Sequence, residues 1–290
     1  MDLSIGVDPE RLASALKWAN ESYADCRICP EDCGVDRHEG ELGLCGLGAD
    51  ARVYKEYLHL GEEEALVPSH TIYLSGCNFR CAFCSDMGPV KNPKLHGLAL
   101  DPANLSRRIA KRRAEGATNV NFVGGLPDVN VLYILRTLTH CPEDTHVVFN
   151  TNLWTTEEAV GVLEGVVGTW LVDFKFGADR CARKLAGIDN YVGHMQRLLP
   201  RVSASANLLI RHLLMPGHVD CCTRPVFEWL SSHLPEALVN VMTGYKPFQL
   251  ALSKSRMGGG LDPSEVDAAL ALARATGLRY IVDGRSGGAV

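Results

Sequence analysis

Short apolar runs, rich in β-branched and aromatic residues, recur along the chain from about residue 70, and each run ends in glycine or polar residues. Runs of this kind, bounded by turn residues, predict buried β-strands. Residues 278–284 are a candidate for a last strand. We expect six strands before it, at residues 71–76, 119–125, 145–152, 169–177, 207–217 and 237–245.

Helix-start signals lie between these runs. A further helix is expected near the N-terminus, at residues 9–23. An N-cap residue followed by proline or by acidic residues marks three starts, at residues 101–102, 155–158 and 262–263. Strands that alternate with helices form parallel sheets, and about six such units can curve into a barrel. The sequence therefore predicts an α/β fold, a partial (β/α)6 barrel of the TIM type, with its chemistry at the carboxyl ends of the strands.

The first 70 residues differ in composition from the rest. After the first helix they are dense in cysteine, glycine and charged residues and show little hydrophobic periodicity. A segment of this kind cannot bury a core of its own, so a bound metal is expected to organise it. We predict a Cys-rich, metal-binding extension at residues 1–70 and a barrel at residues 71–290.

Charge and hydropathy exclude several classes of partner. The net charge of -5 argues against nucleic acid. The basic stretch at residues 107–113 is explained by a solvated helix face. The N-terminus has no basic stretch followed by an apolar core, and no run is long enough to span a membrane. The sequence predicts a soluble, cytoplasmic protein without nucleic-acid or membrane partners.

Seven of the 11 cysteines fall into two clusters, Cys26, Cys29, Cys33 and Cys45, then Cys77, Cys81 and Cys84. Clustered thiols in a reducing compartment indicate metal binding. Three thiolates can hold three irons of a [4Fe-4S] cube and leave the fourth iron free for another ligand. A zinc site at the triplet would need a fourth ligand, which His70 or His96 could supply. The position of the triplet at a strand end favours the iron-sulfur interpretation.

The spacing Cys77-x3-Cys81-x2-Cys84 after a strand resembles the signature of the radical S-adenosylmethionine (SAM) superfamily. The resemblance implies a [4Fe-4S] cluster whose open iron binds SAM. It also implies reductive cleavage of SAM to a 5'-deoxyadenosyl radical, hydrogen abstraction from a substrate, and an electron donor of the flavodoxin or ferredoxin type. By the same resemblance, Phe83 packs near the adenine.

The other strand ends extend the resemblance. The turn Gly124-Gly125-Leu126-Pro127 resembles the Gly-Gly-acidic-Pro turn whose backbone meets the SAM amino group, although Leu126 replaces the acidic residue. SAM contacts are implied for the ends of the later strands, at Asn150, Asn152, Asp173, Lys175, His212 and Lys246.

The segments "DFKFG", "ARKLAGIDNY", "RHLLMPG" and "VNVMTGYKP" resemble the branch of Fe-S proteins related to pyruvate formate-lyase activating enzyme. In that branch Lys175 suits the SAM carboxylate and Asp173 a nearby cation. The alternative is an ion pair without a ligand. Asn150 stands where activating enzymes tend to carry aspartate, and Lys246 stands near their SAM-contacting histidine.

The remaining cysteines leave alternatives open. The N-terminal quartet fits the same branch, and four thiolates suit structural zinc and a second [4Fe-4S] cluster equally. Cys181, Cys221 and Cys222 are weak candidates for donating a hydrogen atom to a substrate radical, against the interpretation as incidental buried thiols.

Three functions are compatible with these motifs. The first is activation of a glycyl-radical enzyme. The second is radical modification of a small molecule or a peptide, which the unusual residues Ser85-Asp86-Met87 after the triplet favour. The third is a non-enzymatic, degenerate Fe-S binding or sensing protein, which has no need for the pair Asp173 and Lys175.

Overall fold

The computed structural model describes residues 1–253 and 256–285. The chain divides into two compact units. The first unit comprises residues 1–78, 86–170 and 205–207, and the second comprises residues 79–85, 171–204 and 208–290. The boundary crosses the cysteine triplet, because Cys77 belongs to the first unit whereas Cys81 and Cys84 belong to the second.

The first unit is built on four neighbouring strands, β1 (Val53–His59), β2 (Ser69–Leu74), β3 (Asn119–Gly124) and β4 (Val147–Thr151). β1 pairs antiparallel with β2, whereas β2, β3 and β4 are parallel. Leu74 lies opposite Gly124, so β2 and β3 end at the same level. The core between these strands and their helices contains Phe122, Phe149 and Trp170, which pack edge to face.

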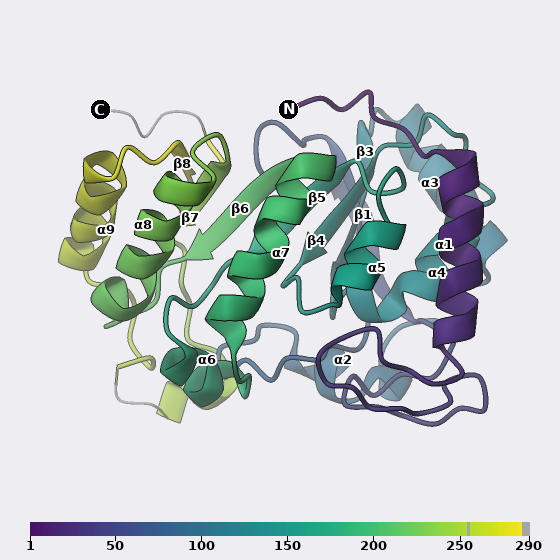
Figure 1. Ribbon diagram of the computed structural model, residues 1–290, viewed down its shortest axis with the longest axis horizontal. Helices are drawn as coiled ribbons and strands as arrows, with labels where there is room; N and C mark the ends of the chain where they lie inside the picture. Colours follow the sequence, from purple (N-terminus) through teal and green to yellow (C-terminus); the bar gives the residue numbers. More distant parts are fainter. Residues whose placement is uncertain (254–255, 286–290) are drawn as a thin grey trace. The chain divides into compact units, whose positions relative to one another are not determined.

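Helices cover the strands of the first unit, namely α1 (Pro9–Ser22), α2 (Met87–Lys91), η1 (Pro93–Leu95), α3 (Pro102–Ala114), η2 (Asp128–Asn130), α4 (Val131–Leu138) and α5 (Glu157–Val162). The Asp8 carboxylate caps the start of α1. One face of α1 buries Leu12, Ala15 and Ala19. α1 lies beside α4 and α5 (Figure 1), so this stripe closes the helical layer of the unit.

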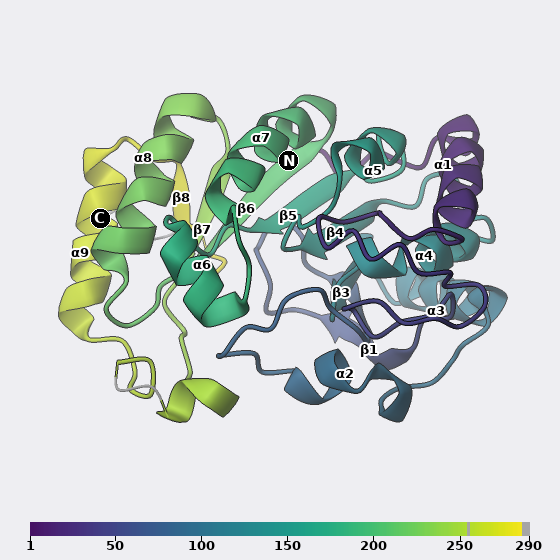
Figure 2. The ribbon, with the colours of Figure 1, turned by 60° about the horizontal axis from the view of Figure 1, so that its bottom comes forward.

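The second unit contains the parallel strands β6 (Asn207–Leu213), β7 (Leu238–Met242) and β8 (Tyr280–Val282), and it is entered through β5 (Thr169–Asp173). Its helices are α6 (Asp179–Ala186), α7 (Tyr191–Ser205), the π-helix η3 (Val219–Thr223), α8 (Arg224–His233), η4 (Gln249–Ser253) and α9 (Pro263–Ala275). α8 and α9 pack side by side (Figure 2). Asp262 caps α9 in a reciprocal arrangement with Glu265.

The predicted α/β class is confirmed, since the expected runs form strands and the expected cap residues open helices. β1 was not expected. Its polar residues hide the apolar pattern by which the other strands were predicted. One of them, Glu56, accepts hydrogen bonds from Arg112 on α3 and contacts His70 on β2. Among the described residues, no helix is long and apolar enough to cross a membrane. The domain boundary at residue 70 and the cytoplasmic location stay predictions.

The ends of β2 and β3 approach each other so closely that only glycine fits. The Gly125 N–H donates to the Leu74 carbonyl at 2.5 Å. A Cβ on Gly125 would lie 1.8 Å from the Gly76 carbonyl oxygen, and Gly124 has a φ of +101°. Both glycines are therefore required by the backbone of the turn that leads into Cys77.

We expect Gly125→Ala to destabilise the protein by about 1–3 kcal/mol, because the added methyl group must displace backbone rather than a side chain. The matched control is Gly193→Ala, an exposed position inside α7 where a Cβ meets nothing within 4 Å. That control should gain about 0.5–1 kcal/mol of helix stability. Urea unfolding followed by circular dichroism compares the two, and equal midpoints would contradict the close approach.

The connection between β3 and α4 buries a carboxylate. Asp128 is 4% exposed, and its Oδ2 accepts a hydrogen bond of 2.5 Å from the Thr151 hydroxyl at the end of β4. Burial raises the pKa of Asp128 to about 6, and the Thr151 hydrogen bond opposes this only in part. The pair fixes the end of β4 relative to the turn after β3.

The raised pKa of Asp128 makes stability depend on pH. The folded pKa lies above the ordinary value of 3.8, so stability from this group is present below about pH 4 and is lost as pH rises to about 6. Relative to Asp128→Asn, the wild type should lose up to about 3 kcal/mol across this window. Urea midpoints of both proteins at a series of pH values measure the difference. A constant difference would show that Asp128 does not titrate there.

Candidate functional site

The sequence-predicted site residues separate into two groups by unit. The first unit holds Cys26, Cys29, Cys33, Cys45, Cys77, Gly124, Gly125, Asn150 and Asn152. The second unit holds Cys81, Phe83, Cys84, Asp173, Lys175, Cys181, His212, Cys221, Cys222 and Lys246. The N-terminal quartet lies between α1 and β1, and Cys181, Cys221 and Cys222 lie on α6 and η3, whereas the other residues lie at the ends of strands or in the loops that follow them.

In the first unit, Asn78 connects the start of the cysteine triplet to its surroundings. Its side-chain amide donates to the Trp154 carbonyl at 2.9 Å and hydrogen-bonds the Cys29 sulfur. Its oxygen accepts from Asn152 at 3.4 Å. Asn78, the residue after Cys77, therefore hydrogen-bonds both to the end of β4 and to the N-terminal cysteine quartet. Apart from its position inside the motif, no sequence pattern predicts this role for Asn78.

Asn150 and Asn152 lie at the end of β4, and both are buried. The Asn152 side chain is held by its own loop, since its oxygen accepts from the Trp154 N–H at 3.1 Å. Asn130 ties the neighbouring turn in place by donating to the carbonyls of Ser75 and Leu126. Polar groups from the loops after β2, β3 and β4 therefore lie together at one edge of the first unit.

The N-terminal cysteine quartet, Cys26, Cys29, Cys33 and Cys45, lines a single cavity in the first unit. A short antiparallel bridge shapes its first loop, because the Cys26 N–H donates to the Val35 carbonyl at 2.9 Å. Burial raises the pKa of Cys29 to about 12 and also raises that of Cys45. Four thiols around one cavity fit a metal centre, which would hold them as thiolates.

Arg37 supplies a buried positive charge at this cavity. Its side chain is 2% exposed, stacks 3.8 Å over the Tyr23 ring and donates to the carbonyls of Gly48 and Val129. Its Nη1 also lies 3.9 Å from the Cys26 sulfur. No described carboxylate forms an ion pair with Arg37. Because a buried cation needs a compensating charge, the residues fit an anionic centre in which the thiols are deprotonated.

In the second unit, the loop of residues 79–85 presents the other two cysteines of the triplet. Its backbone is fixed to the end of α6, because Arg80 and Ala82 donate to the carbonyls of Ala186 and Leu185. The Cys84 N–H donates to the Cys81 carbonyl at 3.1 Å. Burial raises the pKa of Cys81 to about 12, and the positive charge of Lys175 opposes that effect.

The predicted pair at the end of β5 is close to Cys81 in this unit. Lys175 Nζ lies 2.5 Å from Asp173 Oδ2, and both side chains remain partly exposed. Tyr191, fully buried on α7, accepts from the Lys175 N–H and donates to the Asp173 carbonyl. Tyr191 therefore fixes the backbone that carries the two charged side chains. Both charges act electrostatically on the nearby Cys81 thiol.

Phe83 packs between two aromatic rings of the second unit, with its centroid 6.4 Å from Phe176 and 6.2 Å from Tyr245. The Tyr245 hydroxyl is itself fixed by donating to the Met257 carbonyl at 2.8 Å. Lys246, the next residue, is exposed. The aromatic group is consistent with a stacking surface for a planar ligand, and the roles of Phe83 and Lys246 toward SAM stay predictions.

His212 has both ring nitrogens engaged within the protein. Nδ1 donates to the Phe174 carbonyl at 2.7 Å, and Nε2 accepts from the Thr223 hydroxyl at 3.0 Å. Burial lowers its pKa to about 4, so the ring is neutral at pH 7. These bonds make His212 a positioning residue between β5, β6 and η3, and its expected contact with SAM stays a prediction.

Cys181, Cys221 and Cys222 are scattered in the sequence but meet in the second unit. In the part of the chain that the structure describes, they are the group of three metal-ligating side chains whose ligand atoms lie within 4.8 Å of one another. No three sulfurs of the N-terminal quartet, which lines its own cavity, lie this close together.

One relative shares most of this sequence. The chain is 38% identical over 282 residues to the uncharacterized protein MJ0674 of Methanocaldococcus jannaschii, and the match covers 96% of this chain and 82% of that protein. No family model matches the chain.

Solved structures of radical SAM enzymes share the fold. Streptococcus suis SuiB bound to S-adenosylmethionine matches with a TM-score of 0.50 and 15% identity, over 71% of this chain and 48% of SuiB. The FeFe-hydrogenase maturase HydG from Carboxydothermus hydrogenoformans matches with a TM-score of 0.50 and 16% identity, over 71% of this chain and 51% of HydG. The chain thus spans about half the length of these two enzymes.

These likenesses confirm the predicted fold class, a partial barrel of the TIM type. The chain belongs to the family of the uncharacterized M. jannaschii protein MJ0674 and has the fold of the radical SAM enzymes.

Proposed function

We propose that this protein is an enzyme that reductively cleaves S-adenosylmethionine and removes a hydrogen atom from a substrate. The observation that carries the proposal is the placement of Asp173 and Lys175 beside Cys81 at the end of β5. A sensor that only bound a cluster would not need a carboxylate and an amine at that position. The triplet spacing in the sequence supports the same conclusion.

The residues of the chain would act by binding and positioning. Cys77, Cys81 and Cys84 would hold a [4Fe-4S] cluster, which would supply the electron that breaks a carbon-sulfur bond of SAM. The Lys175 ammonium suits the SAM carboxylate, and Asp173 suits a cation or an amino group. Phe83 offers its ring to the adenine. The backbone of Gly124 and Gly125 can approach a ligand closely because neither residue has a side chain.

The N-terminal quartet is proposed to hold a second [4Fe-4S] cluster rather than zinc. Four thiolates bound to one zinc ion converge within about 3.8 Å of one another, from a Zn–S distance of about 2.3 Å. The quartet sulfurs do not converge to within 4.8 Å in any set of three, whereas the four irons of a cube spread their ligands apart. Arg37 would balance the negative charge of such a cluster.

Activation of a glycyl-radical enzyme is the proposed use of the radical, with an electron donor of the flavodoxin or ferredoxin type. The alternative is modification of a small molecule or a peptide. Ser85-Asp86-Met87 favours the alternative, because these residues follow the triplet where activating enzymes often carry other ones. Whether the substrate that stimulates SAM cleavage is a macromolecule or a compound of low mass decides between them.

Anaerobic reconstitution with iron and sulfide, followed by dithionite and SAM, tests the reaction. We expect 5'-deoxyadenosine from the wild type and none from Cys81→Ala, because the cluster loses a ligand. Cys141→Ser, a half-buried thiol outside both clusters, is the matched control and should retain the activity. An iron content of about eight per chain would support the second cluster, and about four would contradict it. Absence of 5'-deoxyadenosine from the iron-loaded wild type would contradict the proposal that the protein is an enzyme.

Binding of SAM tests the role of Lys175. We expect Lys175→Met to raise the Kd for SAM about 10- to 100-fold, because a charge-assisted hydrogen bond to the carboxylate is lost. Lys184→Met, on the exposed face of α6, is the control and should bind as the wild type does. Equilibrium dialysis with labelled SAM on the reconstituted proteins measures both. Equal affinities would mean that Lys175 does not bind the SAM carboxylate.

A further inference from the structure

Three thiols meet in the second unit, away from both cysteine clusters in the sequence. Cys181 lies in the first turn of α6, and Cys221 and Cys222 are consecutive residues of η3. The Cys181 and Cys221 sulfurs are 3.6 Å apart, and the Cys221 and Cys222 sulfurs are 3.9 Å apart. All three ligand atoms lie within 4.8 Å of one another.

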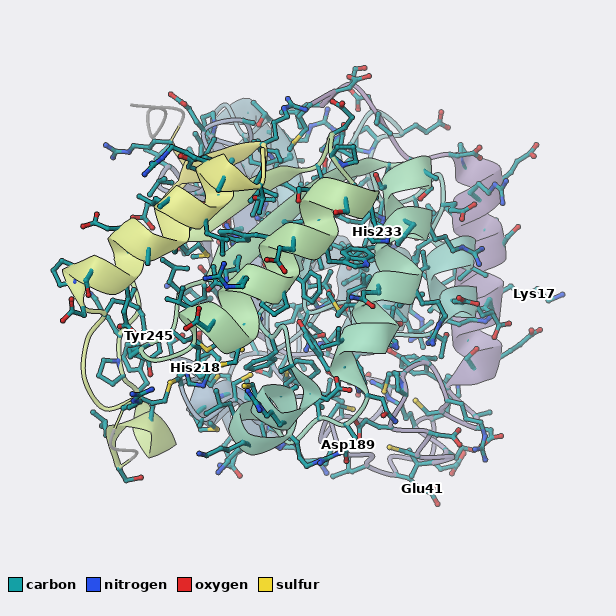
Figure 3. All side chains as sticks on the ribbon, turned by 60° about the vertical axis from the view of Figure 1, so that its left-hand side comes forward. Lys17, Glu41, Asp189, His218, His233 and Tyr245 are labelled. Atoms are coloured by element: carbon teal, nitrogen blue, oxygen red, sulfur yellow. The ribbon has the colours of Figure 1, made fainter. Side chains whose placement is uncertain are left out.

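The backbone holds these sulfurs in place. η3 is a single π-helical segment, a form that recurs at functional sites, and its wider turn lets two consecutive cysteines face the same partner. Its start is fixed by N–H groups of Cys222 and Thr223, which both donate to the His218 carbonyl. Figure 3 shows His218, the residue directly before η3.

The loop after β5 closes on the same segment. A Cβ on Gly177 would lie 2.4 Å from the Cys222 carbonyl oxygen, so only glycine allows this approach. The Gly177 N–H donates to the Cys222 sulfur. The sulfur is thus oriented by backbone groups from another part of the unit, in the manner of a supported metal ligand.

The spacing of the sulfurs identifies the kind of ligand. A tetrahedral zinc ion with Zn–S bonds of about 2.3 Å separates its sulfurs by about 3.8 Å, which agrees with the 3.6 Å and 3.9 Å found here. A disulfide would need a separation of about 2.05 Å, and a cube would need ligands placed on different irons. We propose that Cys181, Cys221 and Cys222 form a site for a single Zn²⁺ ion, bound by three thiolates.

Charge and access are consistent with such a site. Binding forms three Zn–S bonds and releases to solvent the proton of each thiol that becomes a thiolate. The resulting centre carries one negative charge, and Arg180 lies close enough to act favourably on Cys221. Cys221 is only half-buried, so the ion can enter and a water molecule can take the fourth position.

Elemental analysis of reconstituted protein, equilibrated with Zn²⁺ and desalted, tests the site without measuring SAM cleavage. We expect Cys181→Ser and Cys221→Ser each to contain about one zinc per chain less than the wild type, with iron content unchanged. Cys141→Ser should contain as much zinc as the wild type. Equal zinc in all four folded proteins would overturn the proposal.

Alkylation of the wild type provides a second measurement that requires no variant. Iodoacetamide should modify Cys221 slowly in zinc-loaded protein and at least tenfold faster after a chelator removes the ion. Mass spectrometry of peptides from anaerobically purified protein reads the modification. Equal rates with and without the chelator, or a disulfide between Cys181 and Cys221, would show that the three thiols do not hold zinc.

Discussion

The parallel pairing of β2 with β3 is the constraint on which the first half of the site depends. Leu74 lies opposite Gly124 at the ends of the two strands, and the next residues are held by the hydrogen bond from Gly125 to Leu74. Because Gly76 and Gly125 touch through their backbones, the chain that leads into Cys77 has one available path. A side chain at either position would move the first cysteine of the triplet.

Charge compensation is the second organising principle of the molecule. Arg37 is buried beside four thiols without a described carboxylate partner, whereas Lys175 is paired directly with Asp173. Thiols that bind a metal are anionic and would compensate the charge in the first arrangement. The second arrangement places two opposite charges near Cys81. A ligand with both an amine and a carboxylate could break this ion pair and bind its amine to Asp173 and its carboxylate to Lys175.

The sequence predicted a large part of the fold because its strands and helices carry local signals. The cap of α9 by Asp262 and its end at Gly277 were readable from neighbouring residues. β1 was missed because an edge strand needs only one buried face, so polar residues interrupt its apolar pattern. One of these residues, Glu56, forms an ion pair with Arg112. Asp128 was also missed, because nothing in the neighbouring residues predicts that its carboxylate is buried and accepts a hydrogen bond from Thr151.

The sequence by itself determined the cysteine triplet, the glycine turn and the alternate pair at the end of β5, because each is encoded within a few neighbouring residues. Only the tertiary structure decided which distant residues meet. Cys181 and Cys221 lie 40 positions apart, and Arg37 contacts Val129 across 92 positions. Such contacts follow from how helices and loops pack on the strands, and hydrophobic periodicity carries no record of that packing. The spacing of the sulfurs, which separates a site for one ion from a site for a cluster, is therefore a property of the folded chain alone.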